Sequence, residues 1–151
     1  MLDEIDLKIV NILQRKARIP NVEVARQVGM APSAVLERIR KLEKQGYING
    51  YEVRLNPRRF NRAQVVFVMI QIVLTEAETI ATALAAIDQV QEVHLVSGAD
   101  ALLVKLRVAD TDQLGQLLKA TIAPIAGVRA TNSMVVMQTA KETAQFSIDS
   151  A

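Results

Sequence analysis

The chain has no cysteine and no tryptophan, and its 151 residues include a single histidine, His94. Without cysteine there can be no disulfide bond, no thiolate zinc site and no cysteine nucleophile, and one histidine cannot build a multi-histidine metal centre. A phosphate-binding glycine loop is also missing. The only catalytic-type cluster would combine His94 with Asp100 and Glu92, and we give His94 a structural role in its strand. We therefore expect a protein that is not an enzyme and has no cofactor or metal.

Long apolar runs are absent as well. No stretch reaches the roughly 18 uncharged apolar residues that a membrane span requires. The first ten residues, MLDEIDLKIV, carry acids where a secretory signal would carry basic residues. We expect a cytoplasmic protein with no membrane partner. Since 50% of the residues are hydrophobic, the chain can bury the core of one domain or of two small ones.

Charge is unevenly distributed along the chain. Residues 1–62 hold 13 Lys and Arg against 7 Asp and Glu, whereas residues 63–151 hold 5 against 9. A basic segment followed by an acidic one suggests that the first faces nucleic acid and the second has another task. Lysines and arginines that serve only solubility would be the alternative explanation.

The spacing of apolar residues in the first third predicts three helices, over residues 3–16, 22–28 and 33–45. Their ends carry caps and terminators: Asp3, Asn21, Gly29, Pro32 and Gly46. The turn between the second and third helices is very short, which is typical of a helix-turn-helix. We expect this DNA-binding domain to cover residues 1–52.

The third helix would be the recognition helix. Val35, Ile39 and Leu42 form an apolar stripe that faces the core. Its other side presents the candidate DNA-binding residues Ser33, Ala34, Glu37, Arg38, Lys41 and Lys44. Residues near the start of such a helix reach base edges in the major groove, while cations and hydroxyls hold phosphates. The alternative is a solvated helix with ordinary ion pairs such as Glu37–Lys41.

A small wing and a linker are expected next. Asn49-Gly50 is a strong signal for a β-hairpin, and Val53 and Leu55 alternate as in a short strand. Residues 53–63 would form a linker or hinge. Its arginines could bind flanking phosphates, or they could only solvate the hinge: Arg54, Arg58, Arg59 and Arg62.

The pattern changes at Gln64. Apolar, β-branched runs predict strands over 65–74, 90–96, 101–108 and 128–138, with helices over 75–87 and 110–122. The order β-α-β-β-α-β over residues 64–139 is the ferredoxin-like arrangement, with one antiparallel sheet and both helices on one face. The fold class is therefore α+β.

Two strands of this sheet are apolar on both sides, so the face without helices also needs cover. We expect a second copy of the sheet to provide it in a homodimer. The methionines of these strands would be core or interface residues: Met69, Met134 and Met137. The tail, residues 140–151, is polar; it could be loose or could pack on a neighbouring subunit.

Three parts of the sequence carry a specific resemblance: LDEIDLKIVNILQ, VGMAPSAVLERIRKLEKQGYINGY and the β-α-β-β-α-β second half. Together they are similar to the Lrp/AsnC (leucine-responsive/asparagine-related, or feast/famine) family of prokaryotic transcription regulators. The resemblance implies a winged helix-turn-helix, double-stranded DNA as partner, association with the nucleoid and regulation of amino-acid or nitrogen metabolism. It also implies dimers that assemble further, typically into octamers, with an amino-acid effector bound between dimers.

The same resemblance places the effector site at Gly98, Ala99, Asp100, Thr131 and Ser133. Asp100 could hold the ammonium of an amino acid, and backbone or hydroxyl donors could hold its carboxylate. Three features depart from the family: Ala31 replaces the usual N-cap serine, the loop at Gly98 is a residue shorter and lacks an aromatic, and Ala130-Thr131 stands where an Arg-Thr pair is common. Gly98 and Asp100 could instead form only a turn. An effector-independent architectural DNA-binding protein and a small-molecule sensor with secondary DNA binding are therefore the alternatives.

Overall fold

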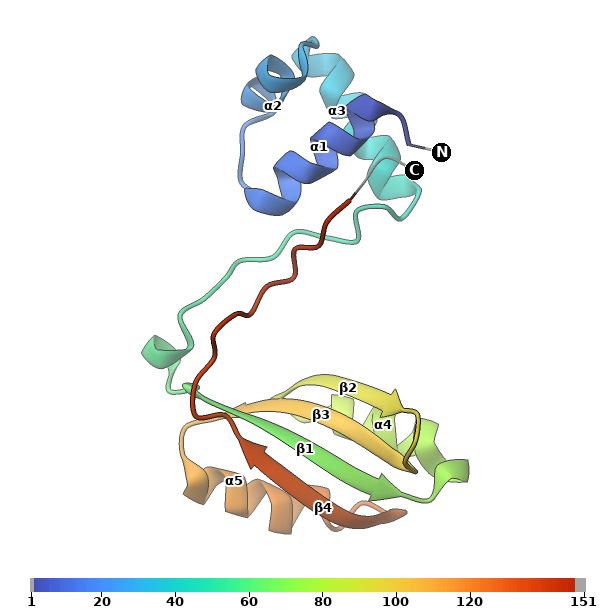
Figure 1. Cartoon of the computed structure of the whole chain (residues 1–151), viewed down its shortest axis with the longest axis vertical. Helices are drawn as coiled ribbons and strands as arrows, with labels where there is room; N and C mark the ends of the chain where they lie inside the picture. The colour runs from blue at the N-terminus through green and yellow to red at the C-terminus, as the bar shows by residue number, and fades with distance from the viewer. Residues whose placement is uncertain (1, 149–151) are drawn as a thin grey trace. The chain divides into compact units, whose positions relative to one another are not determined.

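A computed structural model describes residues 2–148. The chain forms two compact units (Figure 1). One runs as far as Arg54 and takes up the chain again from Lys141, and the other spans Leu55–Ala140. The first unit is therefore discontinuous in sequence. In the part of the chain that is described, no helix has the length and apolar character that crossing a membrane would require.

The first unit contains α1 (Glu4–Arg15), α2 (Asn21–Val28) and α3 (Pro32–Lys44). Asp3 caps α1 as expected, and it forms a reciprocal capping box with Asp6. The expected cap at Asn21 is wrong, because Asn21 is already helical and Pro20, which has no side-chain cap to offer, precedes it. Gly29 adopts φ 71°, the left-handed conformation that allows the tight turn toward α3.

All three helices contribute to one small core. Ile9 of α1, Val24 of α2 and Val35 of α3 are fully buried, and Ala25 lets α2 lie close to its neighbours. Burial of each larger side chain of this kind stabilises a fold by about 1.5–3 kcal/mol. The predicted apolar stripe of α3 is thereby confirmed.

The expected hairpin at Asn49-Gly50 and the strand at Val53 and Leu55 are wrong for this single chain. The backbone from Tyr47 to Asn56 has no strand pairing. A two-residue type I′ turn requires positive φ at both central positions, and neither Asn49 nor Gly50 has it. The Tyr51 hydroxyl instead donates to Glu43 Oε1 at 2.9 Å, which ties the segment to the end of α3.

The second unit contains β1 (Gln64–Ile72), α4 (Ala77–Ala85), β2 (Val90–Val96), β3 (Ala101–Val108), α5 (Thr111–Leu117) and β4 (Val128–Val135). The strands form one antiparallel sheet in the order β2-β3-β1-β4, which confirms the ferredoxin-like prediction. Several predicted ends were wrong. The strand predicted over 65–74 ends at Ile72, and a 3₁₀ turn, Leu74–Glu76, follows it. The helix predicted over 110–122 is an α-helix only as far as Leu117 and continues as a π-helix, Leu118–Ile122. The strand predicted over 128–138 ends at Val135.

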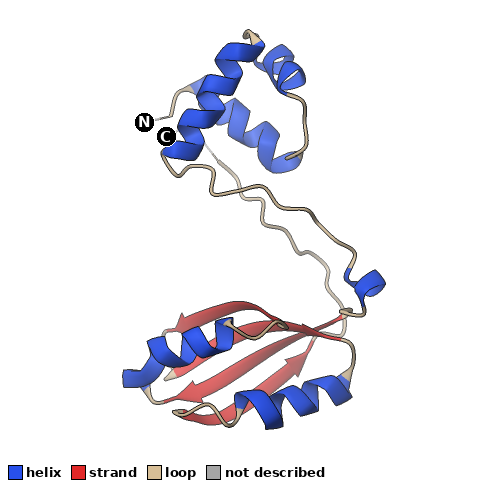
Figure 2. Cartoon of the chain, turned by 180° about the vertical axis from the view of Figure 1, so that it is seen from behind, coloured by secondary structure: helices blue, strands red, loops and turns tan. Residues whose placement is uncertain are grey.

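Both helices cover the same face of the sheet (Figure 2). Alternate residues of β1, among them Val66, Val68 and Ile70, are fully buried against Ile80 and Leu84 of α4. This confirms the expected placement of the two helices.

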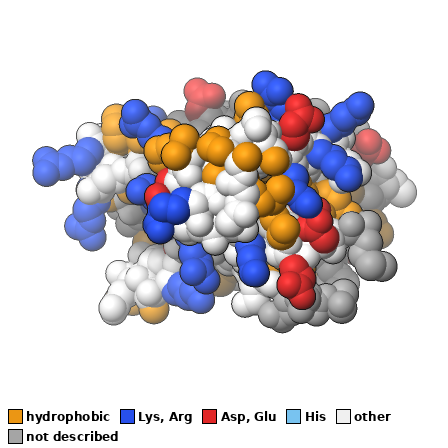
Figure 3. Space-filling model, turned by 90° about the horizontal axis from the view of Figure 1, so that it is seen from above, with side chains coloured by type: hydrophobic (Ala, Val, Ile, Leu, Met, Phe, Trp, Pro, Cys, Tyr) orange, Lys and Arg blue, Asp and Glu red, His pale blue; other side chains and the backbone are white. Residues whose placement is uncertain are grey.

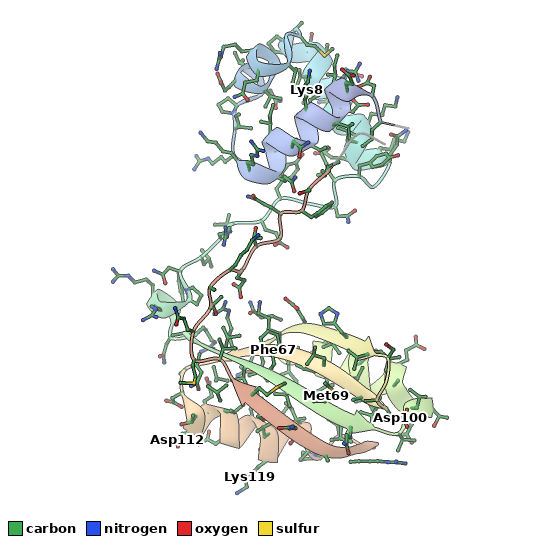
Figure 4. All side chains as sticks on the ribbon, viewed as in Figure 1. Lys8, Phe67, Met69, Asp100, Asp112 and Lys119 are labelled. Atoms are coloured by element: carbon green, nitrogen blue, oxygen red, sulfur yellow. The ribbon has the colours of Figure 1, made fainter. Side chains whose placement is uncertain are left out.

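The opposite face of the sheet, called the open face here, has two parts. Phe67 and Met69 of β1 point to it and are half-buried (Figure 4), whereas on the β2–β3 side Glu92 pairs with His94 and Lys105. The Met134 side chain, on β4, is 47% exposed and Met137 is 99% exposed. Among the described residues these two methionines therefore lie at the surface and not in the core of the second unit.

Candidate nucleic-acid interface

The outer side of α3 is polar and open to solvent. Ser33, Glu37, Lys41 and Lys44 are exposed, and Ala34 is half-buried. Arg40 belongs to the same surface, with 66% of its side chain exposed, although the sequence-based list omitted it. At about 100° per residue, Arg40 lies about 140° from the buried Val35 and about 100° from the buried Ile39 around the helix, so it points away from the core. Helical phase alone could therefore have identified it.

Arg38 occupies a different position, at the border between α3 and α1. Its Nη1 atom lies 2.7 Å from Asp3 Oδ2 and 2.7 Å from Asp6 Oδ1, and 28% of its side chain is exposed. The backbone N–H of Asp6 and the Arg38 guanidinium lower the pKa of Asp3. Arg38 thus connects the capping box of α1 to α3, which fixes the orientation of the candidate recognition helix.

Lys41 and Lys44 have no ion pair among the described residues. Glu37 Oε1 lies 3.9 Å from Arg40 Nη1, and the Glu37–Lys41 pair of the alternative interpretation is not formed among the described residues. On α2, Arg26 and Gln27 hydrogen-bond Glu23 and lower its pKa to about 2. Figure 3 shows Lys and Arg side chains spread around one face of the molecule. Lys41 and Lys44 of α3 are therefore available to bind phosphates.

The start of α3 also suits a phosphate. Ala31 provides no side-chain cap, as its sequence predicted, and Pro32 is the first helical residue. First-turn N–H groups that no side chain caps can donate to an anion, and the helix dipole favours a negative charge there.

Arg54 is engaged elsewhere. Its Nη2 atom donates to the backbone oxygen of Glu142 at 3.2 Å, within the first unit. The hydrogen bond occupies one of its donors and leaves the exposed guanidinium with others.

The residues expected to bind an effector lie near one end of β1. Gly98, Ala99 and Asp100 form the turn between β2 and β3, and the backbone oxygen of Asp100 accepts from Ile72 N at 2.9 Å. Figure 4 shows Asp100 at this end of the sheet. Thr131 and Ser133 belong to β4, on the other side of β1, where they pair with Ile70 and Val68. The two sets are thus separated by the width of β1.

Sequence reasoning missed Glu76 and Gly127 at the same end of β1. Val73 N donates to Gly127 O at 2.9 Å, directly after the residue that bonds Asp100. Glu76 packs so closely over Gly127 that a Cβ atom there would clash with its carboxylate. Because Glu76 and Gly127 are far apart in the sequence, no local sequence pattern indicates that they are in contact.

Two family models cover most of the chain. Residues 2–49 match a winged helix-turn-helix DNA-binding model, and residues 65–146 match the Lrp/AsnC ligand binding domain. The chain belongs to the Lrp/AsnC family. As a member, it is a DNA-binding transcription regulator with a ligand-binding second domain.

Relatives of known name support this membership over nearly the full length. The leucine-responsive regulatory protein of Haemophilus influenzae is 41% identical over 145 residues, which are 94% of this chain and 87% of that protein. The protein of the same name from Escherichia coli K12 is 41% identical and covers 93% and 88% of the two chains. These relatives are regulators rather than enzymes.

Solved structures share the fold. An AsnC-family regulator from Agrobacterium tumefaciens superposes with a TM-score of 0.89 at 26% identity and covers 97% of both chains. A transcriptional regulator from Neisseria meningitidis in complex with L-Met has a TM-score of 0.90 at 24% identity, again over 97% of both chains. Escherichia coli AsnC matches with 0.88 at 23%, over 96% of this chain and 98% of its own.

Proposed function

We propose that this Lrp/AsnC regulator places α3 in the major groove of specific operators in genes of amino-acid or nitrogen metabolism. The observation that supports this most strongly is the outer side of α3, where Ser33 is exposed near the start of the helix and Lys41 and Lys44 are exposed near its end, with no ion pair among the described residues. Phosphate contacts from these lysines would set affinity, and Ser33, Ala34, Glu37 and Arg40 would lie toward the bases. Arg38 would act by holding α3 on α1, and Arg54 would bind a flanking phosphate. Such a protein works at the nucleoid.

Selection of binding sites from random duplexes, followed by footprinting, tests this function. A two-fold symmetric dimer should select half-sites about 10 base pairs apart, or a multiple of that distance. Binding without any preferred sequence would contradict a specific regulator.

The second domain is proposed to bind an amino acid between dimers, at a site that includes the end of β1 where Asp100 lies. Asp100 would hold its ammonium group, and the backbone at Gly98 and Ala99 or the hydroxyls of Thr131 and Ser133 would hold its carboxylate. The relatives named for a response to leucine support this ligand class. Thermal melting with each amino acid tests it, because a ligand at 100 times its dissociation constant stabilises a protein by about 2.7 kcal/mol.

A homodimer is proposed to form through the open face of the sheet, with dimers assembling further into octamers. The half-buried Phe67 and Met69 support the dimer, since apolar side chains without a covering layer favour association. Light scattering of Phe67→Asp tests this, with Leu95→Asp as the control. Leu95 is 58% exposed and pairs with Leu102, so it lies toward the helical face. Phe67→Asp should dissociate the dimer, and Leu95→Asp should not.

An effector-independent architectural DNA-binding protein is the second candidate. It is favoured by one observation, the separation of Asp100 from Thr131 and Ser133 by β1 within a single chain. Melting curves that no amino acid shifts, together with intact DNA binding, would select this second function.

A further inference from the structure

The carboxy-terminal segment from Lys141 to Ile148, here called the tail, makes its contacts in the DNA-binding unit. The ligand-binding family model runs to residue 146, which assigns most of this segment to the second domain. The structure groups it with α1, α2 and α3 instead. Membership in the second domain therefore does not explain where the tail packs.

The central contact is a pair of hydrogen bonds between Gln14 and Phe146. Gln14 Nε2 donates to the backbone oxygen of Phe146 at 2.9 Å, and the backbone N of Phe146 donates to Gln14 Oε1 at 3.3 Å. Gln14 Nε2 also donates to Asn11 Oδ1 at 3.1 Å, which holds the amide in place. Both the nitrogen and the oxygen of the Gln14 side-chain amide therefore hydrogen-bond the tail.

Apolar contact extends the attachment. Ile148 is half-buried and packs against the core cluster of the three helices. Ser147 and Ile148 also form one wall of a cavity of about 590 Å³, whose other walls include Ile12 and Ile19. The Phe146 side chain, in contrast, is 72% exposed, so its backbone and not its ring makes the contact.

The path of the chain toward the tail is short. Val136 N donates to Val65 O in the last sheet hydrogen bond, and Glu142 already accepts from Arg54. Only residues 137–141 lie between these two points. The tail is therefore covalently continuous with the sheet and is held on the helix-turn-helix unit by non-covalent contacts, in addition to the covalent linker at residues 55–63.

We propose that the surface formed by Gln14 of α1 and by the neighbouring cavity wall at Ile12 and Ile19 is a docking surface for this chain's own tail, and that docking stabilises the helix-turn-helix. The occupant is fixed by the paired hydrogen bonds at Gln14 and by the burial of Ile148. This inference does not depend on the DNA-binding activity of α3.

Hydrogen exchange of full-length variants tests the docking. Phe146→Pro removes the N–H that donates to Gln14, whereas Phe146→Ala keeps that N–H and removes only an exposed ring. Phe146→Pro and Gln14→Ala should each speed exchange of the α1 amides about fivefold, because each removes at least one hydrogen bond. Phe146→Ala should leave α1 near the wild-type rate, and β1 and β3 should be unchanged in all three variants.

A second measurement uses the tail as a separate peptide. A chain that ends at Ala140 should lose protection in α1, and a synthetic peptide of residues 141–151 at about 1 mM should restore it. Unchanged α1 exchange in Phe146→Pro, Gln14→Ala and Ile148→Asp would overturn the proposal, even if the shortened chain fails to fold. DNA binding measured on the same proteins distinguishes tail docking from the proposed function. If the variants lose α1 protection but the wild-type protein does not bind DNA, only the proposed function is contradicted.

Discussion

Arg38 and Lys41 lie on the same helix, yet the structure predicts different effects when each is replaced by alanine: Lys41→Ala should weaken the salt dependence of DNA binding, and Arg38→Ala should lower stability. Lys41 is exposed and has no ion pair among the residues described, so its ammonium is free to displace a counterion from DNA. Arg38 already holds Asp3 and Asp6, both at 2.7 Å. A phosphate would have to compete with two carboxylates for this guanidinium.

The expected magnitudes follow from counterion release and from the ion pairs. The plot of log K against log salt has a negative slope, and each lost phosphate contact makes it shallower by about 0.9. Lys41→Ala should therefore reduce the magnitude of the slope by about 0.9 per protomer. Arg38→Ala should leave the slope unchanged. It should instead destabilise the first unit by about 1 kcal/mol, because the ion pairs of Arg38 with Asp3 and Asp6 are partly exposed and solvent weakens them.

Fluorescence anisotropy with a labelled operator at several salt concentrations measures the slope, and thermal unfolding measures stability. Lys119→Ala is the matched control, because Lys119 is an exposed lysine of the second unit with no ion pair among the described residues (Figure 4). It should change neither quantity. A slope reduced by a full phosphate contact in Arg38→Ala, with unchanged unfolding, would refute a positioning role for Arg38.

Two further predictions concern stability. Gly127 has φ 90° and a Cβ atom there would lie 2.8 Å from Ile80 Cδ1, whereas Gly98 has φ 86° and open space around it. Gly127→Ala should therefore destabilise the second unit by about 2–5 kcal/mol, and Gly98→Ala by about 1–3 kcal/mol, as measured by denaturant unfolding; equal losses would contradict the close contact. Asp3 has its pKa lowered from 3.8, so its ionised form stabilises the folded first unit above that pH, and the contribution is lost as pH falls through the lowered pKa. Acid titrations by circular dichroism should show a shallower loss in Asp3→Asn than in the wild type.

Local chemistry allowed the sequence to predict most of the elements. Asp3 caps α1, Asp110 accepts from Gln113 N at the start of α5, and Gly29 ends α2 in the left-handed conformation. Each of these residues acts within a few positions along the chain. The apolar runs correctly predicted the order of strands and helices along the chain, and that order led to the ferredoxin-like antiparallel sheet.

The errors arose where a contact distant in sequence competes with a local preference. Asn49-Gly50 favours a hairpin locally, but the Tyr51 hydroxyl binds Glu43 and no second strand lies alongside. Helical phase also placed Arg38 on the outer side of α3, but it did not indicate that carboxylates 32 and 35 positions away reach this side chain, and its contact with DNA stays a prediction. Periodicity identifies a face of a helix, but it cannot identify what lies opposite that face.

The tail shows the same limit most clearly. Its residues are polar and small, so neither periodicity nor hydrophobicity distinguishes it from a disordered end. Its position depends on the backbone of Phe146 and on an amide 132 residues earlier. A backbone N–H and C=O are present at nearly every residue, so a docking contact made through them leaves no trace in side-chain chemistry. Phe146 and Ile148 are the large apolar residues of the tail, and two such residues in a mostly polar segment do not identify its partner.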